Sequence, residues 1–524
     1  MRSFLVASVL ATVVALALYG YRLGDTPAYL GLDEAHFANH AHSIATTARD
    51  LNGNRLPLFI SLEDPLGDRP TLPWGVTWYH PYGVYLIAAA LTMAPLSEGV
   101  IRAPFVALAA LNLCLIYLVT WRWYHSRALA AAAGGLLALT PAHFILSRLA
   151  LDYVLPLPFT LAWMYCVTSV LRQPTRRIAL ITGLVLGLGC FSYVSSWLMM
   201  PAYLAISLAV IVRQSRRDLL MPLVTGFVLP LLLLVPWVMF HPEMPGNVVA
   251  QYQAGEARRS VVSALLAGDG VAMAVRDAMS AYWSYFDPSF LFVSGGASRL
   301  VSTGSIGVWP IGVAVLMAIG VIRVLRRLGE PWVTVVFVGF VLAPLPAALK
   351  GEPFAIQRAI SLLPFGVLLA VEGLAGAARG TAALRVIAIL AIATLPLQFA
   401  GFVRHYFDGY RPQAARALDP TAFPETARVL IEQWRANGEP ALAITAPLYD
   451  VSAKWRFYAI ANGHEAALAR TTYFNGDLSE LREMPRGTLA VVETATFTPS
   501  DRWTIVARPA SVFGETPLTV LRRE

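Results

Sequence analysis

The sequence predicts an all-α polytopic membrane protein with about eleven transmembrane helices and a small α/β domain at its C-terminal end. Hydrophobic residues make up 57% of the 524 residues and charged residues 14%, whereas about a quarter of the residues in soluble domains are charged. The mean hydropathy is +0.59. Charged residues gather in two stretches, 21–79 and 404–524, which are the candidate extramembrane parts.

Eleven segments have the length and apolar character of a membrane-spanning helix, for which about 17 to 25 residues are needed. They are Phe4–Gly20, Ile101–Trp121, Leu129–Leu146, Leu155–Leu171, Ile178–Tyr193, Trp197–Val212, Leu219–Phe240, Ile306–Val324, Trp332–Leu349, Ala359–Ala377 and Leu384–Phe402. The run Tyr82–Pro95 is too short to span comfortably, so we expect an interfacial or re-entrant helix there. Residues 1–20 could instead be a cleaved signal peptide, but no small-x-small cleavage site follows them.

The arginine clusters orient the chain. They lie at 122–127, 172–177, 213–217 and 323–327, and all four face the cytoplasm if Tyr82–Pro95 does not cross the membrane. An extra span there would place every cluster outside, against the positive-inside rule, so we reject it. The same clusters explain the net charge of +8 more simply than a nucleic-acid partner does.

This topology predicts two domains. A transmembrane domain covers residues 1–402, with external loops at 21–100 and 241–305, and an external α/β domain covers 403–524. The α/β domain is indicated by the helical pattern "ETARVLIEQWRANG" and the strand-like stretches "ALAIT", "TLAVVETA" and "WTIVARP". It contains no visible catalytic motif.

Three carboxylates stand at the external face. Asp33 and Glu34 follow the first apolar segment within one short loop, and Asp152 lies at the next external boundary. A charged carboxylate at the edge of a membrane is energetically costly, so its presence suggests a function, and one such function is catalysis. The alternatives are that Asp33 and Glu34 merely begin a helix, and that Asp152 pairs with Arg148 four residues earlier.

The external loops also carry cations, against the general bias of membrane proteins. They are Arg258, Arg259 and Arg299 in the long loop, and Lys350 and Arg358 in "LKGEPFAIQRAI". A phosphate is the obvious partner, since Arg binds it bidentately and Lys as a point charge. The alternatives are lipid headgroups or pairing with Glu352.

Histidines and aromatic residues of the first loop are less specific. His36 and His40 have the i, i+4 spacing of metal ligands and His42 is near, but no further ligand spacing follows, so a bound metal is not favoured. Several aromatic residues suit the headgroup zone or could line a groove for a sugar or an isoprenoid. They are Trp74, Trp78, Tyr79, Tyr82 and Tyr85.

Several motifs occur together and in order. They are "GLDEAHFANHA", "TARDLNGNRLPLF", "HPYGVYL", "EGVIRAPFVALAAL" with Arg102, "PAHFILSRLALDYVLPL", "FSYVSSWLMMPAYLA", "YFDPSFLFVSGGASRLVSTGSIGVWP" and "QRAISLLP". With them nearly the whole chain resembles the membrane glycosyltransferases of the GT-C fold, close to protein O-mannosyltransferases and the lipid A aminoarabinose transferase. Two departures concern substrate details: Tyr82 replaces a common proline, and "ASRLVSTG" lacks a histidine often found beside Arg299.

The resemblance implies transfer of a sugar from a polyprenyl phosphate, or less favourably a diphosphate, to an acceptor hydroxyl of a lipid, glycan or protein. The reaction would invert the anomeric carbon at the external face of a bacterial inner membrane, without a cofactor. Asp33 would be the general base, Glu34 would orient it or the acceptor, and Asp152 would be a second acid. The residues expected to bind the donor phosphate are Lys350, Arg358 and Arg299. Those expected to bind the substrate are His80, Tyr82, Arg55 and Tyr193.

Two other classes of protein compete with this interpretation. A lipid or glycan transporter also has many helices and basic patches, but such proteins usually show internal repeats and place polar sites near the bilayer midplane. No repeat is visible here, and the acids stand at the external boundary, with the exception of Glu372 in the tenth apolar segment, whose position suggests the cytoplasmic end. A non-catalytic scaffold would leave the convergence of acids and cations on one face unexplained.

Overall fold

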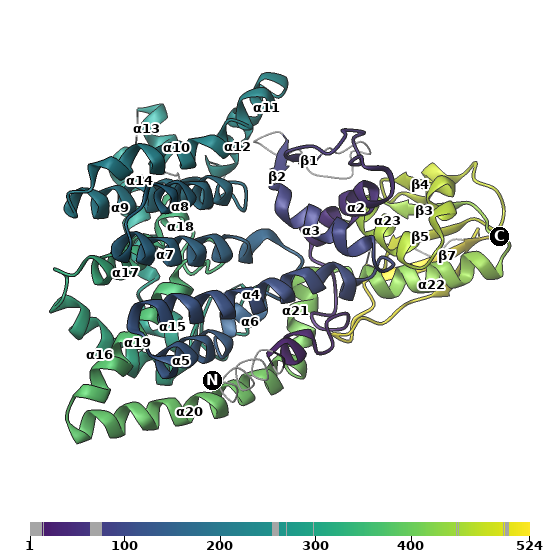
Figure 1. Cartoon of the computed structure of the whole chain (residues 1–524). Coiled ribbons are helices and arrows are strands. Elements are labelled where there is room, and N and C mark those ends of the chain that lie inside the picture. The colour runs from purple at the N-terminus through teal and green to yellow at the C-terminus, as the bar shows by residue number, and fades with distance from the viewer. Residues whose placement is uncertain are drawn as a thin grey trace. The chain divides into compact units, whose positions relative to one another are not determined.

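A computed structural model describes residues 13, 15–62, 76–253, 261–268, 270–296, 298–446, 448, 450–495, 497 and 502–524. The chain divides into two compact units (Figure 1). The first unit contains the described residues up to Tyr21, His80–Gly83 and Phe105–His405. The second contains Arg22–Tyr79, Val84–Pro104 and Tyr406–Glu524.

The first unit is helical. Its elements are most of α4 (Glu98–Tyr124), α5 (Arg127–Ala138), α6 (Pro141–Leu146), η1 (Asp152–Val154), α7 (Pro156–Arg172), α8 (Arg176–Gly189), α9 (Ser196–Arg213), η2 (Arg217–Leu219), α10 (Leu220–Leu231), α11 (Leu234–Phe240), α12 (Met244–Gln253), α13 (Val261–Ala267), α14 (Val271–Ser284), α15 (Pro288–Phe292), α16 (Ile311–Leu325), α17 (Pro331–Leu342), α18 (Leu345–Lys350), α19 (Leu362–Arg379) and most of α20 (Ala382–Phe407).

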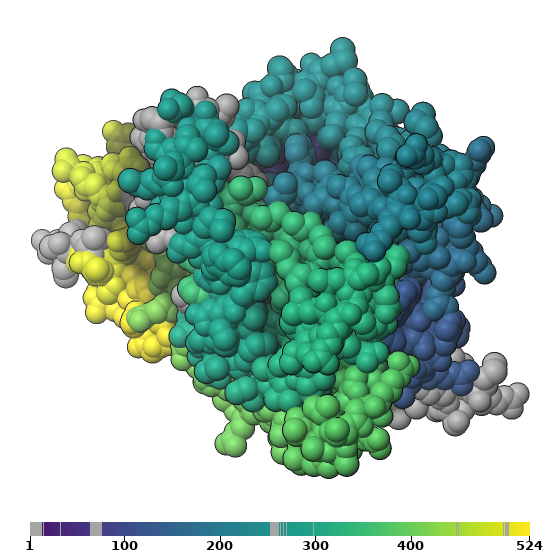
Figure 2. Space-filling view, turned by 90° about the vertical axis from the view of Figure 1, so that its left-hand side faces the viewer, coloured from purple at the N-terminus to yellow at the C-terminus, as the bar shows by residue number. Residues whose placement is uncertain are grey.

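Glycines let several of these helices approach closely. A Cβ atom at Gly320 of α16 would lie 1.9 Å from the carbonyl oxygen of Leu369, and one at Gly373 of α19 would lie 1.9 Å from that of Leu316. Small residues at such crossings are typical of helix packing within membranes. By contrast α20, in green at the bottom of Figure 2, exposes large apolar side chains that suit contact with lipid, among them Ile389, Leu390 and Leu397.

Seven helical stretches among the described residues are long and apolar enough to cross a membrane, so the chain is a multi-pass membrane protein. They are Glu98–Tyr124, Asp152–Arg172, Ser196–Arg213, Arg217–Phe240, Pro331–Lys350, Leu362–Arg379 and Ala382–Phe407. The predicted number of eleven is not confirmed. Most of the predicted span Phe4–Gly20 lies outside the described residues.

Proline shortens two of the other predicted spans. Pro141 starts α6, so Leu129–Leu146 becomes two helices, and Pro310 precedes α16, which then has 15 residues. Proline fixes its own φ and disfavours helix in the residue before it. The predicted span Ile178–Tyr193 forms α8, with 14 residues. The run that we expected not to span forms α3 (Pro81–Leu91), with 11 residues.

An ion-pair network around one buried carboxylate joins three helical segments of the first unit. The Glu372 carboxylate of α19 accepts hydrogen bonds from Arg323 Nε at 2.9 Å, Arg327 Nη1 at 3.0 Å and the Tyr124 hydroxyl at 2.5 Å. The Glu372 side chain is 3% exposed. Removing one member of a buried pair leaves uncompensated charge, which typically costs about 3–5 kcal/mol.

We therefore expect Glu372→Ala to lower the unfolding free energy of the detergent-solubilised protein by about 3 kcal/mol. Glu330→Ala is the matched control, because Glu330 also pairs with Arg327 but its side chain is 45% exposed. An exposed pair contributes about 1 kcal/mol or less, so thermal denaturation should distinguish the two variants. Equal shifts in melting temperature would contradict a structural role for this network.

The second unit combines the first external loop with the C-terminal part of the chain. Its elements are α2 (Leu32–Thr47), the antiparallel strands β1 (Ile60–Leu62) and β2 (Thr77–Tyr79), most of α3, the start of α4, α21 (Arg411–Leu418), α22 (Phe423–Ala436), β3 (Leu442–Thr445), α23 (Val451–Ala461), η3 (Glu465–Arg470), β4 (Thr471–Phe474), η4 (Leu478–Leu481), β5 (Leu489–Glu493), β6 (Trp503–Ala507) and β7 (Leu518–Arg523).

Five strands form one mixed sheet in the order β4-β3-β5-β7-β6, parallel through β5 and antiparallel beyond it. Ala443, Ala490 and Leu521 stand opposite one another and pack with Leu481 on one side of the sheet. Helix α22 lies beside β5 and β7 (Figure 1). The predicted helix and three predicted strands are confirmed as α22, β3, β5 and β6. The domain boundary at residues 402 and 403 falls within α20 and remains a prediction.

Candidate active site

The predicted carboxylates Asp33 and Glu34 belong to the second unit, in the first turn of α2. The helix follows Gly31, whose N–H donates a hydrogen bond to Glu34 Oε2 at 2.8 Å. Acidic residues favour the positive end of a helix, and a Glu at this position can cap the residue before the helix. The alternative that these acids begin a helix is therefore confirmed, and the surroundings of each carboxylate decide what else it can do.

Glu34 is fully buried against Arg102 of α4. Its two carboxylate oxygens accept from Arg102 Nε at 2.9 Å and Nη2 at 3.1 Å. The remaining guanidinium N–H groups donate to the backbone carbonyls of Leu23, Pro27 and Tyr29. Because five N–H groups meet five acceptors, Arg102 fixes the loop that leads into α2. Glu34 is enclosed in this arrangement, which suits a positioning role.

Asp33 has different surroundings, since its side chain is half-buried. Its Oδ1 accepts a hydrogen bond from the Tyr79 hydroxyl at 2.7 Å. Tyr79 ends β2 and packs edge-on against Phe37 of α2, with ring centroids 4.6 Å apart. A carboxylate that is held by one hydroxyl and reaches the surface can accept a proton from a bound molecule. Of the two adjacent acids, Asp33 has the geometry of a base.

The predicted phosphate-binding cations lie in the first unit. Lys350 ends α18, and Gly351 follows with φ of +77°, which turns the chain sharply. Lys350 Nζ lies 3.2 Å from Glu352 Oε1, and Arg358 Nε donates to Glu352 Oε2. Burial raises the pKa of Glu352, but the two cations outweigh this and hold it below its ordinary value. Pairing with Glu352, one of the alternatives for these cations, is confirmed.

Two aromatic contacts support the turn at 351–358. The Tyr285 hydroxyl donates to the carbonyl oxygen of Glu352 at 2.6 Å and accepts from the Ala355 N–H at 2.9 Å. Phe290 lies between Tyr285 and Phe354, with ring centroids 5.6 Å and 5.4 Å away. The turn that carries the cations is thus fixed from within the first unit.

Arg299 lies on a neighbouring loop, which runs between α15 and α16. A Cβ atom at Gly296 would stand 2.8 Å from the carbonyl oxygen of Phe354, so this loop and the 351–358 turn meet at their backbones. Arg299, Asp287 and Phe354 line the same pocket, of about 280 Å³. The predicted cations of the first unit therefore occupy two adjoining loops.

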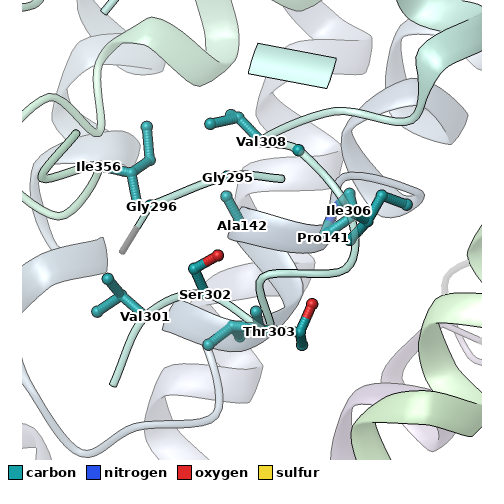
Figure 3. Close-up of a pocket in the computed structure, with 12 residues that line it drawn as sticks. Pro141, Ala142, Gly295, Gly296, Val301, Ser302, Thr303, Ile306, Val308 and Ile356 are labelled. Carbon is teal, nitrogen blue, oxygen red and sulfur yellow. The ribbon is translucent and has the colours of Figure 1, made fainter. Parts of the chain in front are cut away.

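The Arg299 loop packs closely against α6. A void of about 10 Å³ lies between Ala142 of α6 and Gly295, Val301 and Ile356 (Figure 3). A space of this size holds at most one water molecule. Ser302 donates to the Ser294 carbonyl at 3.4 Å and accepts from the Gly304 N–H at 3.2 Å. This void is therefore part of the packing of the loop.

The remaining predicted residues lie at several places. In the first unit His80 is buried edge-on to Trp197, and burial lowers its pKa to about 3, so its ring is neutral at neutral pH. The Tyr82 hydroxyl donates to the Leu188 carbonyl at 3.1 Å. Tyr193 is buried with its ring 5.7 Å from that of Tyr153, the neighbour of buried Asp152. In the second unit Arg55 is exposed.

The structure leaves some alternatives open. Arg148 donates to the Tyr19 carbonyl, and its pairing with Asp152 remains a hypothesis. His36 and His40 have protein partners, and the described part of the chain contains no group of three His, Cys, Asp or Glu side chains suited to a metal ion. Trp74, Arg258 and Arg259 lie outside the described residues.

Sequence reasoning missed the partners that hold the site residues. Tyr79 was considered as a headgroup anchor, and its bond to Asp33 crosses 46 positions. Arg102 was recognised in a motif without its partner Glu34, which lies 68 positions away. A basic side chain within a long apolar helix was the available signal for a buried carboxylate partner.

No protein-family model matches the chain, and no curated protein sequence matches it. Among solved structures, ArnT from Cupriavidus metallidurans bound to undecaprenyl phosphate is similar over 98% of this chain and 97% of its own, with a TM-score of 0.54 and 14% identity. The Archaeoglobus fulgidus oligosaccharyltransferase is similar over 88% and 62%, with a TM-score of 0.49 and 14% identity. Arabinofuranosyltransferase AftD from Mycobacteria is similar over 98% and 41%, with a TM-score of 0.43 and 12% identity. The likeness to ArnT confirms the predicted GT-C fold.

Proposed function

We propose that this protein is a glycosyltransferase that moves a sugar from a polyprenyl-phosphate donor to an acceptor hydroxyl. The observation that carries the proposal is the half-buried Asp33 carboxylate, held by Tyr79 on a loop that the buried Glu34–Arg102 pair fixes. A solved structure of the same fold, ArnT, binds undecaprenyl phosphate. The reaction would take place at the extracytoplasmic face of a bacterial inner membrane, where the positive-inside rule places the Asp33 loop.

In the proposed reaction Asp33 takes the proton of the acceptor hydroxyl as that oxygen attacks the anomeric carbon. The attack comes from the side opposite the phosphate, so the new bond to the acceptor forms as the bond to the phosphate oxygen breaks, and the configuration inverts. The products are the glycosylated acceptor and the polyprenyl phosphate. Phosphate is a good leaving group, so the reaction needs no carboxylic acid to protonate it.

The leaving phosphate needs fixed positive charge instead, and Lys350, Arg358 and Arg299 are the candidates to supply it. Glu352 pairs with Lys350 and Arg358, and Asp287 lines the same pocket as Arg299, so the five charged side chains together have a net charge of +1. A sugar-phosphate-lipid diester carries one negative charge, which such a site would neutralise. His80, Tyr82, Tyr193 and Arg55 remain candidates for substrate binding, and Asp152 for a second acid.

We expect Lys350→Ala and Arg358→Ala each to weaken donor binding about tenfold or more, since a hydrogen bond to a charged group contributes about 1.5–3 kcal/mol. The measurement is binding of undecaprenyl phosphate to the purified protein in detergent. Arg326→Ala is the matched control, because Arg326 is exposed in a loop predicted to be cytoplasmic. Wild-type affinity in both loop variants would remove the phosphate site from the proposal.

The function itself is tested by transfer from a panel of radiolabelled polyprenyl-phosphate sugars. Membranes that contain the wild-type protein should label an endogenous acceptor, and membranes without it should not. The labelled fraction, whether lipid, glycan or protein, would identify the acceptor class. If no donor in the panel is used, a lipid or glycan transporter becomes the better hypothesis, and translocation of labelled lipid across vesicles would be the next assay.

A further inference from the structure

Within the second unit, helix α2 is bound to the C-terminal α/β domain through two buried polar contacts. His36 Nε2 donates to Asp450 Oδ1 at 3.1 Å, and both side chains are nearly inaccessible. One helical turn further on, Asn39 Nδ2 donates to the carbonyl oxygen of Ala453 at 2.8 Å. Asp450 and Ala453 lie at the start of α23, so one helix of the α/β domain holds the helix that carries Asp33.

The contact is close to the proposed base. His36 follows Asp33 by three residues, which places the two side chains on the same side of α2 and about 4.5 Å apart along its axis. Tyr79 contacts α2 as well, through its bond to Asp33 and its packing on Phe37. Since less than one turn separates His36 from Asp33, a shift at His36 also displaces the carboxylate.

The environment of Asp450 also indicates that its side chain is needed. Its φ is +51°, a left-handed conformation that glycine adopts freely and that Asp tolerates better than most other residues. Burying a charged carboxylate carries a desolvation cost, which the His36 bond offsets. An apolar contact could join α2 to α23 without that cost, but it would fix the rotation of α2 less strictly.

We propose that His36 and Asp450 are positioning residues, through which the C-terminal domain holds the Asp33 carboxylate at the acceptor oxygen. The inference rests on the proposed function and gives the C-terminal domain, in whose sequence no catalytic motif is visible, a part in the reaction. A displacement of about 1 Å at a reacting group can cost about 10²-fold in rate. The contact therefore acts on the chemical step and not on donor binding.

The test compares variants that break the contact with variants that keep it. His36→Leu removes the donor, and Asp450→Gly removes the acceptor at a position where glycine is unstrained. His36→Gln and Asp450→Asn each keep a group that can make the hydrogen bond. We expect the first two to lower kcat about 10- to 100-fold with KM for the polyprenyl-phosphate sugar unchanged, and the second two to restore most of kcat. Because His36→Leu and Asp450→Gly both break the contact, the test can still be made if one of these two variants does not fold.

Thr519→Val is the matched control, since it removes a hydrogen bond between Thr519 and Thr494 inside the same domain and does not touch α2. If it lowers kcat as much as His36→Leu at an equal loss of thermal stability, the proposal is overturned. Wild-type kcat in both breaking variants, with Asp33→Asn inactive, would overturn the positioning role and leave the proposed function intact.

A second measurement does not need a substrate. Hydrogen exchange of the α2 amides should rise in His36→Leu and Asp450→Gly but not in Thr519→Val. Unchanged exchange in α2 would overturn the docking contact itself. If no donor in the panel is used, the proposed function has failed, and hydrogen exchange still decides whether the C-terminal domain holds α2.

Discussion

Replacing Asp33 by asparagine is expected to lower the rate of sugar transfer by about 10²–10⁴, the usual contribution of a general base. The change is isosteric, and the asparagine carbonyl can still accept the Tyr79 hydrogen bond that is 2.7 Å long in the wild type. The amide cannot take a proton from the acceptor hydroxyl. The variant should therefore fold, insert and bind the donor like the wild type while transfer is lost.

The measurement is single-turnover transfer by purified protein, together with binding of undecaprenyl phosphate. Asp477→Asn is the matched control, because Asp477 belongs to the same unit but caps η4 at the surface. It should keep the wild-type rate. Near-normal transfer by a folded Asp33→Asn protein would show that Asp33 is not the base, and loss of both transfer and donor binding would indicate a structural role instead.

The features that could be predicted from the sequence are those that depend on residues close together in the chain. Apolar runs of sufficient length identified long membrane helices such as Glu98–Tyr124, and short apolar runs identified strands such as β5. Helix ends were less predictable, since Pro141 and Pro310 interrupt runs whose hydropathy continues through them. The number of spans was therefore the weakest part of the prediction.

The same distinction applies to the candidate site. Glu352 could be named as a partner of Lys350 and Arg358 because all three lie within one short turn. The hydrogen bonds of Asp33 to Tyr79 and of Glu34 to Arg102 could not be predicted in this way. The partners lie 46 and 68 positions apart in the sequence, and only the packing of the chain brings them together. The His36–Asp450 contact crosses 414 positions, and the i, i+4 spacing of His36 and His40 pointed to a metal ion and not to this partner. Sequence reasoning identified candidate groups, and the fold determines which of them are held, buried or left accessible.

Arg102→Lys is expected to remove transfer and to lower the unfolding free energy of the protein by about 2–6 kcal/mol. The guanidinium satisfies five buried acceptors, namely the two oxygens of Glu34 and the carbonyls of Leu23, Pro27 and Tyr29. An ammonium group has three N–H donors, so at least two of these acceptors would lose their partner. Each unsatisfied buried group costs about 1–3 kcal/mol.

The measurement is the melting temperature in detergent together with transfer. Arg428→Lys on the exposed side of α22 is the matched control, and it should change neither quantity. Because Arg102 fixes the chain that runs into α2, the loss of transfer should exceed what the unfolded fraction explains at a temperature where most of the variant is folded. A folded Arg102→Lys protein with the wild-type rate would contradict this, because Asp33 would then keep its place without the five-acceptor arrangement.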